Sequence, residues 1–357
     1  MPVLVAAADK FRGTLSAADA VASVVRAAHR VGWDARSVPL SDGGEGFLDV
    51  LTRLAEAAGV VCVTGPLGHP VAARWLDIGD EVYVESAEAS GLTVVGGAGR
   101  NDPVAASSRG TGELILAAIR GSGAEPAGRA SSGTTRRRPR RVVVGLGGSA
   151  TTDGGLGALR AIEEGGGMGT VELVGACDVL MPFADALRFA AQKGAHGRQL
   201  PLLARRLGRL AQLYRRRYGV DVAALPGAGA AGGIGGAIAA LGGTLRSGFE
   251  VVAERLGLAD ALAGTALVVT GEGRFDATSF TGKVVGGVLE AAREADVPVL
   301  VVAGEIDDHV DRRVGGSDVR ALSLAQRYGD GAARAAAAAC LEETVADELV
   351  AFDTCSW

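Results

Sequence analysis

Cysteine, histidine and aromatic residues are scarce in this sequence. The chain of 357 residues has four cysteines and four histidines, all widely spaced and without a Cys-x-x-Cys pair. This distribution supports neither a zinc site nor a disulfide framework, and it favours a reducing cytoplasm. Aromatic residues make up 4% of the chain and hydrophobic residues 48%. Such a composition is typical of α/β packing built from Val, Ala and Leu rather than of a disulfide-stapled module.

Long apolar runs and an excess of positive charge are also absent. No apolar run approaches the roughly 18 residues that would indicate a membrane span, and residues 2–5 enter an apolar strand without a basic leader. We therefore expect neither export nor a membrane span. The formal net charge of −5 argues against a nucleic-acid surface.

Two basic runs need a separate account. Residues 121–141 contain two Gly/Ser-rich turns and the arginines Arg136, Arg137, Arg138, Arg140 and Arg141. This composition predicts a solvated polar loop, and an anion site is the less favoured alternative. The arginines between residues 205 and 217 lie in a leucine-bearing helical pattern, which predicts a solvated helix face. Almost no aromatic residues interleave with these runs, so neither indicates RNA binding.

The order of the apolar segments predicts the fold. Short β-branched runs alternate with Ala-rich helical stretches at 3–7, 16–30, 35–40 and 45–57. This βαβα order is typical of a largely parallel sheet. Ser16 is the expected N-cap of the first helix. From about residue 60 to 92, Gly-Pro and His-Pro turns with an alternating apolar pattern predict a strand-rich insertion.

Parallel-strand character returns later in the chain. Further strands are expected at 142–144, 171–176, 267–269 and 299–302. The chain exceeds the usual length of one domain, so we expect a largely parallel, Rossmann-like α/β domain formed by residues 1–64 and 265–357. A second, inserted α/β domain is expected from residues 65–264. Ligands bind outside the carboxyl ends of such strands, and the active site is expected in a cleft between the domains.

Glycine is abundant, and its 55 residues cluster in short loops. Four such loops, at 9–14, 42–46, 145–155 and 270–283, lie at the ends of predicted strands and add carboxylates, hydroxyls or cations. A kinase needs backbone N–H groups and cations to hold polyphosphate, a carboxylate-held Mg²⁺ and an aligned acceptor hydroxyl. The four loops offer those parts.

The first two loops carry cations and acids. Lys10 and Arg12 could pair with a phosphate or with a substrate carboxylate, although such residues are also common on plain surfaces. In the second loop, Asp42 suits a metal ligand or a general base. For Glu45 we favour a simpler role, in which its charge complements the dipole of the following helix.

The third loop combines glycines and hydroxyls between a Val-rich strand and a helix. Its candidate residues are Gly147, Gly148, Ser149 and Thr151. A strand, a glycine loop and a helix N-terminus in this order predict an anion cradle. The alternative is a tight turn capped by Thr152 or Asp153, which explains only two or three of these residues.

The fourth loop holds carboxylates and cations at another strand end. Its candidate residues are Gly271, Glu272, Gly273, Asp276 and Lys283. This combination suits a metal ion and a phosphate. Ion pairing of Glu272 and Arg274 within the loop is the alternative.

Two further segments resemble nucleotide-binding motifs. Gly282 and Lys283 do not form a Walker A loop, because residue 277 is Ala and residue 284 is Val. Residues 227–232 satisfy Gly-x-Gly-x-x-Gly, and Glu250 lies about where a ribose-binding acid would fall, so an NAD-dependent dehydrogenase of a small hydroxy acid is an alternative. A proline before the first glycine and a short preceding strand signal favour instead a Gly/Ala-rich loop and a packed helix. This loop could still line a nucleotide pocket.

Taken in order, these segments resemble the bacterial glycerate kinase family, of the glycerate 2-kinase type. Residues 9–16 are similar to its D-x-F-K-G-[ST]-x-[ST] motif and residues 39–46 to its P-x-A-D-G-G-E-G motif. Further markers lie at 65–71, 88–92, 110–114, 147–155, 176–179, 192–195, 226–233 and 270–283. The match covers most of the chain, from Asp9 to about Gly304, and so many markers in order make a chance match very improbable.

The resemblance implies ATP-dependent phosphorylation of D-glycerate with Mg²⁺, usually on the 2-hydroxyl, to give 2-phosphoglycerate and ADP. It also implies two α/β domains with the active site in their cleft. Its partners are glycerate and ATP, with no nucleic acid and no membrane, and the oligomeric state is not predicted. Arg12, Ser41, Arg109 and residues 180–183 depart from the family pattern. A catalytically lapsed ligand-binding homologue is therefore a second alternative.

The candidate residues divide by expected role. The catalytic residues are Asp42, Lys10 and Asp276. The substrate-binding residues are Arg12, Ser149 and Thr151. The nucleotide- and phosphate-binding residues are Gly147, Gly148, Gly229, Gly232, Gly271, Gly273 and Lys283. The metal ligands are Asp153, Asp178 and Glu272.

Overall fold

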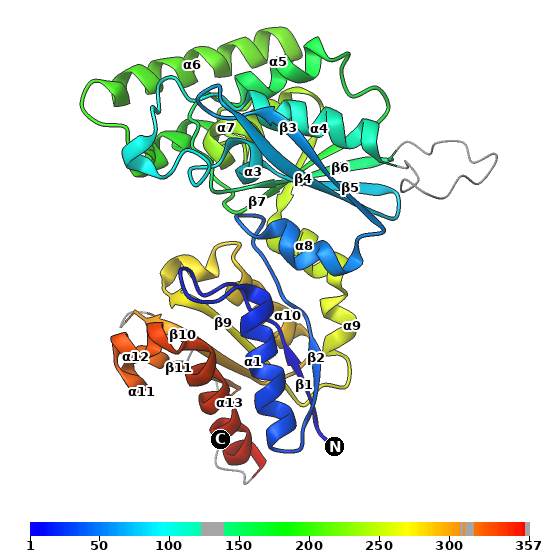
Figure 1. Cartoon of the computed structure of the whole chain (residues 1–357), viewed down its shortest axis with the longest axis vertical. Helices are drawn as coiled ribbons and strands as arrows, with labels where there is room; N and C mark the ends of the chain where they lie inside the picture. Colours follow the sequence, from blue (N-terminus) through cyan, green and yellow to red (C-terminus); the bar gives the residue numbers. More distant parts are fainter. Residues whose placement is uncertain (123–138, 308–309, 311–317, 354–357) are drawn as a thin grey trace, which may run out of the picture. The chain divides into compact units, whose positions relative to one another are not determined.

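The computed structural model describes residues 1–122, 139–307, 310 and 318–353. It divides into two compact units (Figure 1). Unit 1 comprises residues 1–42 and 249–357, and unit 2 comprises residues 43–248. Each unit has its own sheet, and the described sheets are mostly parallel. The predicted α/β fold with an inserted second domain is confirmed.

The unit boundaries differ from those predicted at residues 64 and 265. Strand β3 (Ala57–Thr64) pairs antiparallel with β4 (Pro70–Ile78), which ties residues 57–64 to the sheet of unit 2. At the other boundary, most of helix α8 (Gly248–Leu256) and all of α9 (Leu258–Leu262) belong to unit 1. Strand pairing between distant segments therefore decides where unit 2 begins.

Unit 1 contains a parallel five-stranded sheet in the order β11-β10-β9-β1-β2. Its strands are β1 (Val3–Ala6), β2 (Asp34–Ser37), β9 (Leu267–Phe275), β10 (Val299–Ile306) and β11 (Val319–Ser323). From β1 the chain goes first to β2 on one side and later to β9 on the other. The β1/β9 pair is thus the topological switch point, outside whose carboxyl end ligands bind in open α/β sheets.

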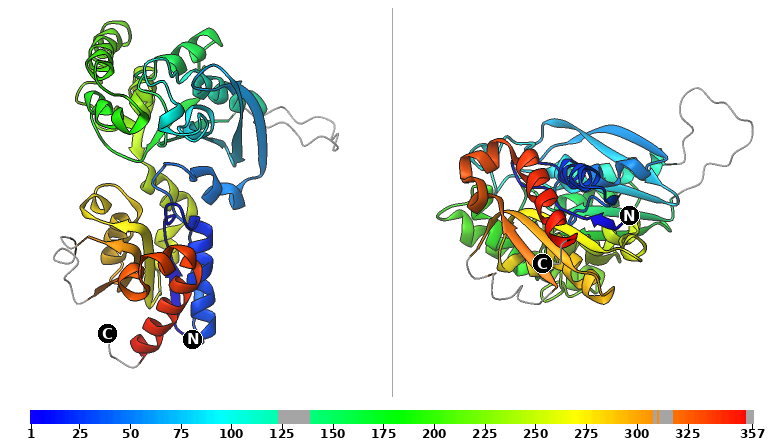
Figure 2. Two further views of the ribbon diagram at one scale, coloured as in Figure 1. Left: turned by 60° about the vertical axis from the view of Figure 1, so that its left-hand side comes forward. Right: turned by 90° about the horizontal axis from the view of Figure 1, so that it is seen from below.

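Helices bury the strands of unit 1. Helices α1 (Ala17–Arg30) and α13 (Ala337–Asp353) lie side by side, as Figures 1 and 2 show. Val24 and Val345 from these helices join Leu4 of β1 in one buried apolar core. The predicted N-cap is confirmed, because Ser16 Oγ accepts a hydrogen bond from the Asp19 N–H at 3.1 Å. The remaining helices are α10 (Val284–Glu294), α11 (Leu324–Tyr328) and α12 (Asp330–Ala335).

Unit 2 contains a six-stranded sheet in the order β3-β4-β5-β6-β7-β8. The other strands are β5 (Glu81–Glu85), β6 (Arg141–Leu146), β7 (Glu172–Cys177) and β8 (Thr244–Ser247). Strands β3 to β5 run antiparallel, and β5 to β8 are parallel. The strand-rich segment and the later return to parallel strands are both as predicted.

Helices α4 (Arg109–Gly121) and α7 (Ala230–Ala240) share the main apolar core of unit 2, which includes Val84, Leu114 and Ile234. Helix α6 (Gln199–Tyr218) buries Leu207 and Tyr214 in a second core and exposes its arginines, as predicted. The remaining helices are α2 (Phe47–Leu51), α3 (Ser86–Ser90) and α5 (Leu156–Glu164).

Two local predictions were wrong. The helix expected at 45–57 stops at Leu51 and a 3₁₀ turn, because β3 pairing begins at Ala57. The polar loop expected at 121–141 ends before Arg141, which starts β6 and pairs with Glu81 and with Glu172 at 2.9 Å. Residues 123–138 of the expected loop lie outside the described residues. In the part of the chain that the structure describes, no helix is both long and apolar enough for a membrane span.

Candidate active site

Two of the predicted loops, together with Asp42 at the start of a third, lie in unit 1 at the carboxyl ends of its strands. The Asp9 N–H donates to the Gly271 carbonyl at 3.0 Å, which places the loop after β1 beside the end of β9. The Leu40 N–H donates to the Ala8 carbonyl at 3.0 Å, so the segment leading to Asp42 also lies beside β1. The acids of these loops therefore gather at the switch point of the sheet.

Two of these acids have strongly raised pKa values. Burial is the main cause for Asp9, and the charge of Asp42 adds to it, so that its pKa rises to about 7 although Lys10 and Lys283 oppose the shift. Burial likewise raises the pKa of Glu272 to about 7. Buried acids with shifted pKa values beside specific charges are typical of functional sites. Asp9 was not a predicted site residue, because an acid at a strand end is common on surfaces.

Asp276 and Lys283 lie together in the same unit. The Asp276 carboxylate accepts hydrogen bonds from the N–H and the hydroxyl of Thr278 at 2.8 and 2.6 Å. Burial opposes ionisation, but these bonds and the nearby cations lower the pKa of Asp276 overall. Lys283 Nζ donates to the Thr278 hydroxyl at 3.1 Å. Arg274 Nε lies 3.9 Å from an Asp276 carboxylate oxygen, so the ion pair of Arg274 within this loop is with Asp276 and not with Glu272.

A cavity of about 240 Å³ lies in unit 1 beside these loops. Its walls include the buried side chains of Phe11 and Leu324 and the exposed side chains of Arg12, Arg274 and Arg334. The cavity therefore combines apolar walls with cations, close to the carboxyl ends of β9 and β10.

Residues 43–46, at the start of unit 2, pack against the carboxyl ends of β6 and β7. A Cβ atom at Gly147 would lie 2.5 Å from Gly44 Cα and 2.9 Å from an Asp178 oxygen. A Cβ atom at Gly43 would lie 2.6 Å from the Ala176 carbonyl oxygen. These glycines are therefore required for close packing of the loops, and Gly148 is required by its φ of +60°.

The predicted hydroxyls of unit 2 surround a buried lysine. Lys193 Nζ donates to Ser149 Oγ at 2.8 Å and to the Thr151 carbonyl at 2.7 Å. Burial lowers the pKa of Lys193 to about 8, although Asp178 and Asp153 oppose the shift. The sequence marked Lys193 only as part of a family motif, because nothing in a short polar stretch indicates burial.

Asp153 has the capping role that was the alternative for its loop. Its carboxylate accepts hydrogen bonds from the Gly155 N–H at 3.0 Å and the Gly157 N–H at 3.2 Å, at the start of α5. It also accepts from the N–H and the hydroxyl of Ser108, both at 2.8 Å. The Asp153 carboxylate oxygens thus already accept several hydrogen bonds from the protein itself. Among the residues that the structure describes, no group of three or more His, Cys, Asp or Glu could hold a metal ion.

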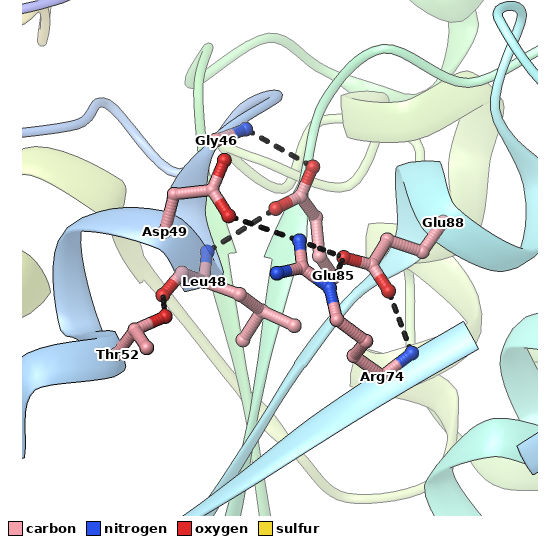
Figure 3. A network of polar contacts seen from close by, with 7 residues as sticks. All are labelled: Gly46, Leu48, Asp49, Thr52, Arg74, Glu85 and Glu88. Carbon is pink, nitrogen blue, oxygen red and sulfur yellow. Dashed lines mark hydrogen bonds and ion pairs between the residues drawn. The ribbon is translucent and has the colours of Figure 1, made fainter. Parts of the chain in front are cut away.

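Glu85 is a further residue that the sequence did not predict. Its carboxylate accepts hydrogen bonds from the N–H groups of Gly46 and Leu48, each at 3.2 Å (Figure 3). Burial raises the pKa of Glu85 to about 7, although these bonds oppose the shift. Neighbouring Glu88 holds Arg74, whose Nε lies 2.7 Å from its carboxylate. The end of β5 thereby fixes the start of α2.

The Gly-x-Gly-x-x-Gly motif lacks the strand that a dinucleotide fold requires. Residues 219–229 join α6 directly to α7 and contain no strand. A Cβ atom at Gly229 would lie 2.3 Å from the Pro182 carbonyl oxygen, and one at Gly232 would lie 1.9 Å from the Thr151 carbonyl oxygen. The favoured prediction, a Gly/Ala-rich loop and a packed helix, matches the structure.

Two α/β units with buried acids and glycine loops at their strand ends have the parts that the small-molecule kinase class requires. The family model for the glycerate kinase family matches residues 4–165 and 166–351. The chain therefore belongs to the glycerate kinase family, and the predicted enzyme, a glycerate kinase, is confirmed.

Individual relatives agree along most of the chain. A protein of Escherichia coli K12 named glycerate 2-kinase is 36% identical over 345 residues, which cover 86% of each chain. A protein of Bacillus subtilis 168 named glycerate kinase is 35% identical over 346 residues and 85% of each chain. A crystal structure from Salmonella typhimurium LT2, assigned as a glycerate kinase 2, aligns with a TM-score of 0.78 at 30% identity. It covers 99% of this chain and 98% of its own.

Proposed function

We propose that the enzyme transfers the terminal phosphate of ATP to the 2-hydroxyl of D-glycerate. The observation that carries this proposal is the group of interacting acids and lysines at the switch point of unit 1, around Asp9, Asp42 and Glu272. The E. coli relative named glycerate 2-kinase supports the choice of the 2-hydroxyl. The expected cleft between the domains stays a prediction.

The acids and cations of unit 1 fit phosphoryl transfer. Asp42 orients the 2-hydroxyl and accepts its proton as the oxygen bonds to the terminal phosphorus, while the bond from that phosphorus to ADP breaks. Lys10 stabilises the negative charge that develops. Asp276 aligns the segment that carries Lys283 through their shared partner Thr278.

Glu272 is the metal ligand that the structure supports best. Its Oε1 atom is buried and has no hydrogen-bond partner among the described residues. Mg²⁺ favours such an oxygen, and it commonly takes only one or two carboxylates together with phosphate oxygens and water. The ion would neutralise the polyphosphate. Asp178 remains a second candidate, whereas the Asp153 carboxylate is already engaged in capping α5.

The cavity of unit 1 is our proposed place for the nucleoside end of ATP. Phe11 and Leu324 offer apolar contact for a base. Arg12, Gly273 and Arg274 border the same cavity, and Gly271 and Lys283 belong to the adjoining loop, where phosphates would lie. The glycines Gly147 and Gly148 stay candidates for phosphate binding, while Gly229 and Gly232 have a sufficient explanation in packing.

Product analysis tests the proposed function. Purified protein with ATP, Mg²⁺ and D-glycerate should release ADP and form 2-phosphoglycerate, identified by ³¹P NMR against both phosphoglycerates. EDTA should abolish turnover and excess Mg²⁺ should restore it. Formation of 3-phosphoglycerate would refute the regiochemistry, and binding without turnover would support the lapsed homologue.

A further inference from the structure

Lys193 is a buried charge for which the proposed reaction steps have no use. Lys193 lies in unit 2 and is only 7% exposed. Burying an ammonium ion is unfavourable unless hydrogen bonds and charges compensate for lost hydration. A neutral side chain could hold two loops together at lower cost. The presence of a charge therefore needs a reason beyond loop packing.

The hydrogen bonds of Lys193 determine what Ser149 can do. An ammonium group can only donate, so Ser149 Oγ must accept at the 2.8 Å contact. A serine hydroxyl has a single hydrogen, which is then directed elsewhere. Ser149 is 4% exposed, and its hydroxyl donates to no acceptor among the residues that the structure describes. The Ser149 hydroxyl is thus available to donate one hydrogen bond to a ligand oxygen.

Two more hydroxyls lie in the same loop. Thr151 and Thr152 are both completely buried, and the Oγ1 atoms of both have no hydrogen-bond partner among the described residues. A buried hydroxyl without a partner costs free energy, which a ligand could recover. The loop that binds the Lys193 ammonium therefore also carries two hydroxyls that have no partner among the described residues.

The surroundings hold this arrangement in place. Asn101 Nδ2 donates to the Ala150 carbonyl at 2.9 Å and to the Lys193 carbonyl at 2.8 Å, which joins the two segments. A Cβ atom at Gly232 would lie 3.0 Å from Lys193 Nζ. Asn101 therefore holds the Lys193 backbone beside the loop, and the absence of a side chain at Gly232 leaves room for the ammonium group.

We propose that Lys193 is a positioning residue that fixes Ser149 as a hydrogen-bond donor to an oxyanion of one reactant. This inference rests on the proposed function. The oxyanion is a carboxylate or a phosphate oxygen, which share the same hydrogen-bond chemistry. Glycerate and ATP are its two sources, and binding measurements on each distinguish them.

A double-mutant cycle tests the inference. Lys193→Met keeps most of the side-chain volume without the charge, and Ser149→Ala removes the donor. Each should lower kcat/KM about 100-fold, and the double variant should be little worse than either, because Lys193 acts through Ser149. Isothermal titration calorimetry with D-glycerate and with ATP should show weakened binding of only one of them. Arg205→Met, which also replaces a cation by methionine but at an exposed position of α6, is the matched control and should retain activity.

A pH profile separates this role from simple loop support. Activity of the unmodified enzyme should fall as pH rises above about 8, because Lys193 is protonated below its pKa and loses its proton above it. Asp178 and Asp153 face this ammonium and hold its proton on more firmly. The Lys193→Met variant should lack that alkaline limb.

Several outcomes would overturn the inference. Independent, multiplicative effects of Lys193→Met and Ser149→Ala would mean that the two side chains do not act together. Unchanged calorimetric binding of both reactants to folded Lys193→Met would also refute it, whether or not the enzyme turns over. If that variant does not fold, unchanged binding of both reactants to Ser149→Ala refutes it. Absence of glycerate turnover by the unmodified enzyme would instead refute the proposed function.

Discussion

Asp42 lies close enough to the buried Asp9 for its charge to raise the pKa of that neighbour. Asp42→Asn should therefore lower kcat by about 10²- to 10⁴-fold, the usual contribution of a positioned acid or base. The KM for ATP should change little. The same substitution removes a negative charge, so it should also lower the pKa of Asp9. Steady-state kinetics as a function of pH measures both effects.

The chain offers a matched control for Asp42. Asp34 is an exposed acid at the opposite, amino end of β2. Asp34→Asn should leave kcat within about threefold of the unmodified enzyme, as expected for a surface change. A near-normal rate for Asp42→Asn would assign the proton transfer to another residue.

At the residue scale, sequence patterns identified groups at strand ends better than groups buried by distant segments. Asp42 and Lys10 follow strands and were therefore candidates. Glu85 contacts Gly46 and Leu48 across 39 and 37 residues, and Lys193 contacts Ser149 across 44 residues. Burial of this kind results from tertiary packing between distant segments, so it cannot be predicted from a local sequence pattern.

At the element scale, Gly232 lies in a part of α7 where three successive residues have left-handed backbone angles. Gly232→Ala should destabilise the protein by about 3 to 4 kcal/mol. About 1 to 2 kcal/mol comes from its φ of +71°, and the rest from the clash of Cβ with the Thr151 carbonyl oxygen. Urea unfolding, monitored by circular dichroism, measures the loss.

Gly242 provides the control for this prediction. It has a φ of +83°, but a Cβ atom there would meet no other atom within 4 Å. Gly242→Ala should therefore cost only about 1 to 2 kcal/mol. Equal losses for the two variants would show that the loop relaxes and that Gly232 is not needed for packing.

Most elements were predicted because their apolar period is strong. The parallel strands β1, β6, β9 and β10 are continuous Val- and Leu-rich runs, which suit strands buried on both faces. The helix expected after Glu45 was too long, because residues 57–64 also fit an edge strand with alternating exposure. Only pairing with β4 decides between the two conformations.

At the scale of the whole molecule, the sequence predicted two α/β domains and their nesting but not where they divide. The division follows pairing partners, such as β3 with β4, that lie outside any one segment. The family resemblance had a different basis, because its markers are short glycine-rich motifs spread along the chain. Close backbone approaches explain why such motifs tolerate no larger residue at Gly43 or Gly147.

Ligand stabilisation of the whole protein tests the proposed nucleotide site. ATP with Mg²⁺ at about 100 times its Kd should stabilise the protein by about 2.7 kcal/mol, which raises Tm by about 4 °C, whereas NAD should have no such effect. Ala325→Phe places a ring in the unit 1 cavity and should abolish the ATP shift. Ala332→Phe adds the same ring at an exposed position that does not line the cavity, so it should keep the shift. A full ATP shift in Ala325→Phe would place the nucleotide elsewhere, and stabilisation by NAD alone would favour the dehydrogenase alternative.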